Sequence, residues 1–143
     1  MMKMIKSKPG VLLLLMWLIT SHFQVFAQEE VVPKKNFAYF SLEPDIVTNY
    51  LGSSARKLGY VRVTVELMLE DVEYLTAAEH HSPLLRAATI DIFGRQPEEK
   101  VKSLTGREDI RRVCLEQLRD LMKKETGNAM IKDVIFTKYL YQS

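Results

Sequence analysis

The sequence predicts an α+β fold, a small β-sheet with helices packed on one of its faces. Apolar and polar residues alternate strictly from Tyr60 to Glu70, as in a strand with one buried face. Apolar residues then recur at helical spacing between Leu84 and Ile92, and again between Ile110 and Met122. Another β-type segment runs from about Met130 to Tyr141. Strands, helices and a final strand in this order favour helices that cover one side of a sheet.

Two short strands are expected before the central one. The first, Phe37 to Leu42, ends at Glu43-Pro44 because proline cannot donate a hydrogen bond to a sheet. The second, Ile46 to Leu51, is followed by a turn at Gly52-Ser53-Ser54. The last strand of the chain is expected to pair beside the central strand, in a direction that the sequence does not set.

The central strand has two distinct faces. Five aliphatic residues point to one side: Val61, Val63, Val65, Leu67 and Leu69. Arg62, Glu66 and Glu70 point to the other side, and a slip of one residue would bury them, so the register is well fixed. These three charged residues are a candidate protein-contact surface if they remain exposed. The alternative is a sheet face that is simply solvated.

Two helices are expected to follow this strand. Asp71 to His81 predicts a short first helix. Ser82 is expected to cap the second helix, with Pro83 at its first position, and Gly94 and Pro97 end it. The predicted apolar face of the second helix consists of Leu84, Leu85, Ala88 and Ile92.

A long helix is expected before the last strand, while residues 98–104 are ambiguous. Thr105-Gly106-Arg107-Glu108 has the spacing of a capping box. The apolar face of this helix consists of Ile110, Val113, Cys114, Leu118, Leu121 and Met122. Lys123 and Lys124 suit the last turn, where cations favour the helix dipole, and Gly127 suits the end.

Residues 1–27 are predicted to be a targeting segment. Lys3, Lys6 and Lys8 precede an apolar run from Val11 to Ile19, and no acidic residue occurs before Glu29. A membrane-spanning helix needs about 20 mostly apolar residues, and the strictly apolar run is about half that length. Two readings stay open: a signal peptide cleaved between Ala27 and Gln28, or a retained signal anchor. Both place the rest of the chain outside the cytoplasm, because the lysines stay on the cytoplasmic side.

The charge balance excludes a nucleic-acid partner. The targeting segment holds three of the 20 basic residues and none of the 18 acidic ones, so the remainder has 17 basic and 18 acidic residues. The basic excess therefore belongs to the targeting segment. The single cysteine, Cys114, cannot close a disulfide within the chain, and its helical position predicts a buried small hydrophobic residue. A reactive thiol or an intermolecular disulfide is the alternative.

No pattern in the sequence predicts catalysis, a metal or a cofactor. His80 and His81 lie near Glu73, but adjacent histidines point about 100° apart on a helix, and two ligands do not make a zinc site. We interpret them as surface histidines. The paired carboxylates Glu29-Glu30, Glu70-Asp71 and Glu98-Glu99 are interpreted as solvated charge. The tyrosines and phenylalanines of the predicted strands, Tyr39, Phe40, Tyr60, Tyr139 and Tyr141, are expected to serve core and cross-strand packing.

The final segment, Ile131 to Gln142, has the pattern I-x-D-V-x-F-T-x-Y-x-x-Q. Further blocks precede it along the chain: Tyr39 to Pro44, Ile46 to Asn49, Tyr60 to Leu67, Pro83 to Arg86 with Ile90-Asp91, and Thr105 to Glu108 with Ile110. In this order the blocks resemble the FliL family of flagellar basal body-associated proteins. Together they span nearly all of the chain that follows the predicted targeting segment.

The resemblance implies a fold and a place of action. It implies an extracytoplasmic domain, residues 37–143, similar to the stomatin/prohibitin-type (SPFH-like) fold and joined to residues 1–27 by a linker, residues 28–36. It also implies a non-enzymatic accessory protein without a cofactor that supports flagellar rotation and swimming. Such a protein would act on the periplasmic side of the inner membrane, associate with the basal body and its torque-generating stator units, and form homo-oligomers. Cleavage after Ala27 would instead leave it soluble in the periplasm.

One alternative function is a small secreted periplasmic domain that binds a ligand and is unrelated to the motor. It would use an apolar groove between the sheet and the helices, with a few converging polar groups.

Overall fold

A four-stranded antiparallel sheet underlies the fold in the computed structural model, which describes residues 35–52 and 59–142. The strands are β1 (Ala38–Ser41), β2 (Ile46–Tyr50), β3 (Gly59–Leu69) and β4 (Ile131–Gln142). All four predicted strands are therefore confirmed to within a residue or two. The predictions for residues 1–34, namely the targeting segment and most of the linker, lie outside the described residues, as do Ser53 and Ser54 of the expected turn.

β3 holds the sheet together, because each of the other strands pairs with it. β4 pairs antiparallel with β3 along nearly its whole length, from Tyr60 opposite Gln142 to Leu69 opposite Ile131. β1 pairs with the last part of β3 and β2 with its first part. Since β4 occupies one edge of β3, β1 and β2 follow one another along the opposite edge. The direction of the last strand, which the sequence left open, is thus antiparallel.

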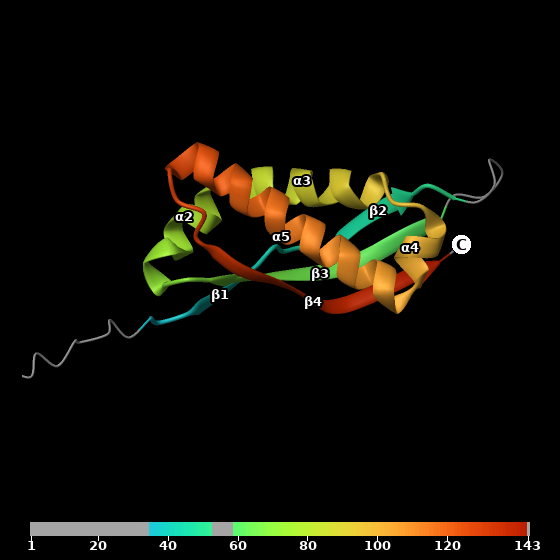
Figure 1. The fold of residues 1–143 in the computed structure, drawn as a ribbon, viewed down its shortest axis with the longest axis horizontal. Coiled ribbons are helices and arrows are strands. Elements are labelled where there is room, and N and C mark those ends of the chain that lie inside the picture. Colours follow the sequence, from blue (N-terminus) through green and yellow to red (C-terminus); the bar gives the residue numbers. More distant parts are fainter. Residues whose placement is uncertain (1–34, 53–58, 143) are drawn as a thin grey trace, which may run out of the picture. The chain divides into compact units, whose positions relative to one another are not determined.

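Helices occupy the chain between β3 and β4. They are a 3-10 turn η1 (Val72–Tyr74), α2 (Leu75–His80), α3 (Ser82–Gly94), α4 (Glu98–Lys102) and α5 (Leu104–Thr126). α3 packs over β2, α5 packs over β4, and the two helices contact one another. Figure 1 shows both on the same side of the sheet, so the predicted α+β arrangement is confirmed.

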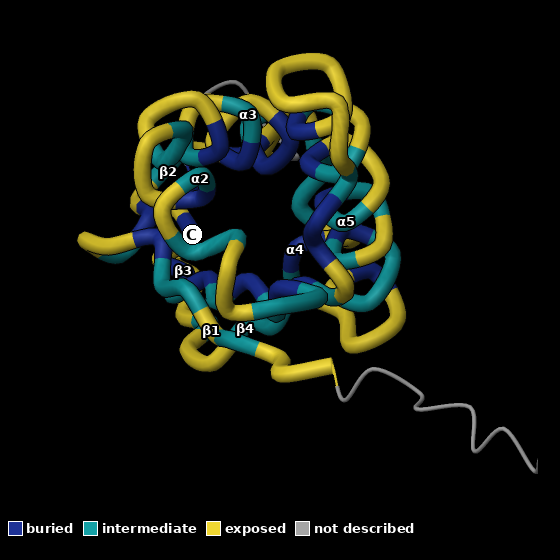
Figure 2. The backbone as a smooth tube through the Cα atoms, turned by 90° about the vertical axis from the view of Figure 1, so that its left-hand side faces the viewer, coloured by how far each residue is buried: buried dark blue, intermediate teal, exposed yellow. Residues whose placement is uncertain are grey.

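The core fills the space between this helical layer and the sheet. The row from Val61 to Leu69 on β3 is fully buried at every second residue. Figure 2 shows the buried segments of α3, α5 and β3 turned towards one another. The largest fully buried side chains are Phe93, Leu42, Ile46, Leu67, Leu69, Leu85, Ile110, Leu118, Met122 and Ile131. Phe93 also packs against two rings of β4, those of Phe136 and Tyr139.

The start of α3 differs from the prediction. Ser82 lies inside the helix, and the residue before it, His81, takes the cap position without a side-chain hydrogen bond. His81 alone separates α2 from α3, and its backbone (φ −93°, ψ 6°) is not extended as at a typical N-cap. Pro83 is the second residue of the helix, one position later than predicted.

The buried face of α3 is rotated about the helix axis relative to the predicted apolar face. Leu85 and Ile92 are buried, whereas Leu84 is 38% exposed. Thr89 and Phe93 are buried instead. Thr89 resides in the core without an unpaired hydroxyl, because its Oγ1 donates to the carbonyl of Leu85 at 2.8 Å.

The N-cap of α5 lies two residues earlier than the capping-box prediction. Ser103 is the N-cap, and its hydroxyl accepts a hydrogen bond from the amide of Gly106 at 3.0 Å. Thr105 is therefore helical, and Glu108 pairs with Arg111 and Arg112 instead of reaching back to a cap. The far end is as predicted: Gly127 ends α5 in a left-handed conformation, with φ of 80°.

Candidate protein-contact surface

The predicted charged row lies on the face of the sheet that the helices leave uncovered. β3 alternates so that Arg62 is exposed while Val61 and Val63 are fully buried. Glu66 and Glu70 follow on the same outer face and are half-buried. The row is thus accessible to solvent on a rigid strand, as the prediction required, although only Arg62 is highly exposed.

An acidic residue that the sequence analysis did not select organises the first half of this row. Asp45, just before β2, accepts a hydrogen bond from the Thr64 hydroxyl at 2.6 Å. It also lies 3.5 Å from Arg62 Nε and 3.4 Å from Lys138 Nζ. The Thr64 hydrogen bond, followed by Lys138 and Arg62, holds the pKa of Asp45 below its usual value. Asp45 therefore remains ionised and links residues from β2, β3 and β4.

The second half of the row is more sparsely paired. Glu70 lies 3.9 Å from Lys35, at a distance where a solvent-exposed ion pair contributes little to stability. Asn36 reaches the same end of the sheet, because its amide donates to the Asp71 carboxylate at 3.4 Å. The last residues of the predicted linker therefore lie against the end of β3.

Exposed apolar side chains flank the charged row on both of its sides. Val47 and Leu140 lie opposite Arg62 on its two sides and are 52% and 53% exposed. With Tyr60 and the end of β4 they line a shallow hollow of about 390 Å³. A cation surrounded by exposed apolar groups is the composition found at protein interfaces, where arginine and tyrosine are enriched.

The strand aromatics, which were expected to serve core and cross-strand packing, divide between the core side and the outer face of the sheet. Tyr139 is half-buried, and its hydroxyl donates to the Val101 carbonyl at 2.9 Å. Burial raises its pKa to about 12. Tyr39 and Tyr60, in contrast, are 58% and 43% exposed on the outer face. Alternation within each strand predicts this exposure, because Tyr60 lies two residues before Arg62 and therefore on the same face of the sheet.

The histidines of α2 and several of the paired carboxylates have contacts within the helical layer. His81 Nδ1 lies 2.8 Å from the carbonyl of Ala77, which engages that ring nitrogen within the helix. Across residues 35–52 and 59–142, no three His, Cys, Asp or Glu side chains are placed to hold a metal ion. Asp71 caps η1 by accepting from the Glu73 amide at 3.1 Å, and Glu98 pairs with Lys102. These carboxylates have structural roles in the helical layer.

Comparison with known proteins identifies the family. The model of the family described as "Flagellar basal body-associated protein FliL" matches residues 39–142. The chain belongs to the FliL family. Membership indicates a flagellar basal body-associated protein, and FliL proteins are flagellar accessory proteins rather than known enzymes.

One known flagellar protein is similar to this chain over most of its length. The flagellar protein FliL of Aquifex aeolicus (strain VF5) is 24% identical over 113 residues. The match covers 79% of the present chain and 66% of the relative, slightly less than two thirds of that protein's length.

The family match begins at Tyr39, in β1, and ends at Gln142, the last residue of β4. It therefore contains the whole charged row, the whole of β2 and β4, and all of β1 except Ala38. Among the residues that the structure describes, no helix is both long and apolar enough to cross a membrane.

Proposed function

We propose that this FliL-family protein is a non-enzymatic accessory of the flagellar motor that associates with stator units and supports rotation and swimming. The outer face of its sheet is the proposed contact surface, with Arg62, Glu66 and Glu70 at its centre. The observation that carries this proposal is the exposed apolar flank around Arg62, formed by Val47 and Leu140, on a sheet whose other face is filled by the core. A contact of this kind changes a motor only if it differs between two stator states.

The proposal places the protein on the periplasmic side of the inner membrane. Residues 1–27 would be the export signal or anchor, residues 28–36 the linker and residues 37–143 the periplasmic domain. Its partners would be the stator units, the basal body, the inner membrane if residues 1–27 are retained, and further copies of the same chain. We also infer that the domain is related to the SPFH-like fold, on the strength of the family resemblance.

Mass spectrometry of the protein from fractionated cells tests the placement. A mass that begins at Gln28 in the periplasmic fraction means cleavage after Ala27. The full-length mass in the membrane fraction means a retained anchor. Recovery of the full-length chain in the cytoplasm would contradict both forms of the proposal.

A charge-reversal pair tests the contact surface. Glu66→Arg reverses a charge in the row, and Glu116→Arg makes the same change on an exposed residue of α5, in the helical layer. We expect Glu66→Arg to reduce swimming under viscous load and to reduce in-cell crosslinking to stator proteins. Glu116→Arg should retain both, at equal protein levels by immunoblot.

Two results would contradict the proposed function. One is normal swimming under load in a strain that lacks the gene. The other is an equal effect of Glu66→Arg and Glu116→Arg, which would mean that the outer face has no special role.

A further inference from the structure

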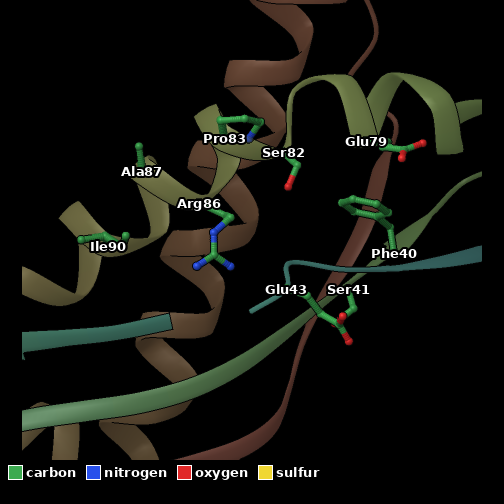
Figure 3. A pocket seen from close by; sticks show the side chains of 9 residues that line it. All are labelled: Phe40, Ser41, Glu43, Glu79, Ser82, Pro83, Arg86, Ala87 and Ile90. Atoms are coloured by element: carbon green, nitrogen blue, oxygen red, sulfur yellow. The ribbon is translucent and has the colours of Figure 1, made fainter. Parts of the chain in front are cut away.

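A second surface lies at the edge of the sheet, apart from the outer face. An open groove of about 720 Å³ separates β1 from the end of α2 and from α3. In Figure 3, Phe40, Ser41 and Glu43 lie on the strand side of the groove, with Pro83, Ala87 and Ile90 on α3 across from them. The groove has apolar walls formed by Phe40, Pro83, Ala87 and Ile90 and carries two carboxylates, Glu43 and Glu79.

The backbone of β1 presents unpaired hydrogen-bonding groups beside this groove. The amide of Leu42 donates to the carbonyl of Val65 at 2.9 Å. Hydrogen-bonded pairs alternate along an antiparallel ladder, so Phe40 and Ala38 also face β3 with their backbone groups. The amides and carbonyls of Tyr39 and Ser41 must then point away from β3, at the open edge. Within the described part of the chain, no strand or side chain pairs with them.

Arg86 closes one end of the open edge. Its Nη1 donates to the carbonyls of Leu42 and Pro44, where β1 leaves the sheet. The guanidinium thus satisfies the backbone at the turn and leaves the stretch from Tyr39 to Ser41 open. Natural proteins usually cover or charge such an edge, because an open one pairs with other chains.

We propose that this groove binds an extended peptide segment of a partner protein, which adds to the sheet as a strand beside β1. Main-chain pairing with Tyr39 and Ser41 offers up to four hydrogen bonds, from two amides and two carbonyls. Alternate side chains of the added strand would point to the helix side and contact Phe40 and Ile90. Peptides that extend a sheet in this way draw affinity from the main chain and specificity from such pockets.

The charge of the groove defines the peptide further. Glu43 and Glu79 are exposed, and neither has an ion-pair partner among the described residues. The Arg86 guanidinium is already engaged by two carbonyls. The segment that fits is therefore extended, with apolar side chains towards Phe40 and Ile90 alternating with lysine or arginine, which would lie towards Glu43 on the strand side of the groove.

This inference is separate from the proposed contact at the outer face. The peptide groove involves none of the charged row, and its test is a binding measurement on the purified protein. If the outer face made no contact with stator units, the groove could still bind a peptide. If the groove bound no peptide, the outer face could still contact stator units.

The probe is an end-capped pentapeptide in which valine alternates with lysine, added to the full-length chain in a non-ionic detergent. Affinity is measured from the fluorescence anisotropy of a labelled copy, and amide hydrogen exchange is followed by NMR. At a peptide concentration ten times the Kd, exchange of the Tyr39 and Ser41 amides should slow about tenfold. The same peptide with a fully N-methylated backbone, and a peptide with glutamate in place of lysine, should bind much more weakly.

Three variants locate the binding. Ser41→Pro removes an outward amide and should weaken the affinity about threefold to tenfold, the effect of one lost hydrogen bond. Ala87→Trp fills the groove from an exposed position and should abolish binding. Asn49→Pro is the matched control, because by the same alternation its amide also points outward, but on β2 and outside the groove. It should bind like the wild type.

The proposal is overturned if the peptide leaves the exchange of Tyr39 and Ser41 unchanged at millimolar concentration. Binding that survives N-methylation overturns it too, as does binding that Ala87→Trp leaves intact. Thermal unfolding confirms that each variant is folded. If Ser41→Pro does not fold, Ala87→Trp and the N-methylated peptide decide the outcome.

Discussion

The sulfur of Cys114 is enclosed by the core at the middle of α5. The side chain is fully buried, as its helical position predicted. Burial raises the pKa of the thiol to about 12, because the thiolate would lose its hydration. A thiol in this state is neither a ready nucleophile nor a ready partner for a disulfide.

We therefore expect Cys114 to resist alkylation by iodoacetamide at pH 8 in the folded protein. Labelling should become rapid when denaturant unfolds the chain. Mass spectrometry of timed samples measures the rate in both states. Rapid labelling without denaturant would show that the thiol is accessible, and would favour a reactive or intermolecular role.

Gly106 marks the closest approach of α4 and the start of α5. A Cβ at this position would lie 2.2 Å from the carbonyl oxygen of Lys100 and 2.6 Å from its Cα. Both are backbone atoms, which cannot rotate away. Glycine at this position allows the two helices to turn so sharply one after the other.

Gly106→Ala should therefore lower the free energy of unfolding by about 1–3 kcal/mol, the range for overpacked sites. Gly94→Ala is the matched control. The nearest atom to its new Cβ is 3.9 Å away, so the change should be neutral or stabilise by up to about 1 kcal/mol. Urea unfolding measures both. Equal stability of the two variants would refute the close approach.

At the scale of the elements, α5 is attached to β4 by two arginines. Arg111 donates to the Val134 carbonyl at 3.3 Å and pairs with the carboxylates of Asp133 and Glu108. Arg119 donates to the Ile131 carbonyl at 2.7 Å. The first half of β4 thus has its outward carbonyls covered by side chains from the helix above.

The pH dependence of stability should report on the ion pair between Glu108 and Arg111, both of which lie in α5. The hydrogen bond from Arg111 lowers the pKa of Glu108 from 4.5 to about 2. A carboxylate whose pKa is lower in the folded state than in the unfolded state stabilises the fold at pH values above the unfolded pKa. This contribution is lost as the pH falls from about 4.5 to about 2. Glu108→Gln should therefore lower the Tm at pH 6, and the difference from the wild type should disappear near pH 2.

Differential scanning calorimetry across this range measures the difference in Tm. Glu116→Gln, on the same helix, serves as the control and should follow the wild type at every pH. A Glu108→Gln difference that stays constant down to pH 2 would mean that the ion pair does not contribute to stability.

The elements themselves were largely predictable, but their first residues were not. The alternation on β3 and the spacing on α5 each repeat over many residues, so they predicted which residues are buried. A cap depends on one side chain and its local backbone. Ser103 and Thr105 are equally suitable residue types, and only the turn that follows α4 selects Ser103.

For the molecule as a whole, the inner face of β3 contributes to the core, and its outer face is the proposed contact surface. Leu67 is fully buried under the helical layer, while its neighbour Glu66 faces outward. Leu67→Ala should lower the free energy of unfolding by about 2–5 kcal/mol because it leaves a cavity in the core. Glu66→Ala should change it by less than about 0.5 kcal/mol. Urea unfolding of both variants measures the contrast, and a similar loss in both would contradict the assignment of the faces.

The sequence predicted the charged row but not its surroundings. Arg62, Glu66 and Glu70 follow from alternation within one strand. The groups around them, Asp45 and Lys138, lie 93 residues apart and meet only through the pairing of three strands. The shift in register between Thr64 and Val65 decides which β4 residues face the row, and no local pattern shows such an irregularity. The open edge of β1 could not be predicted either, because it depends on the order of the strands in the sheet.

The central position of β3 has a mechanical consequence. Ala38 lies opposite Leu69 at one end of β3, and Gln142 lies opposite Tyr60 at the other. Tension that pulls Ala38 and Gln142 apart therefore acts along the strands and loads their hydrogen bonds in shear, many at once. Pulling on Ala38 and Leu69 would instead peel β1 from β3 one bond at a time. Optical tweezers should record a higher rupture force for the first pair of attachment points, and an equal force would show that the strands do not carry the load.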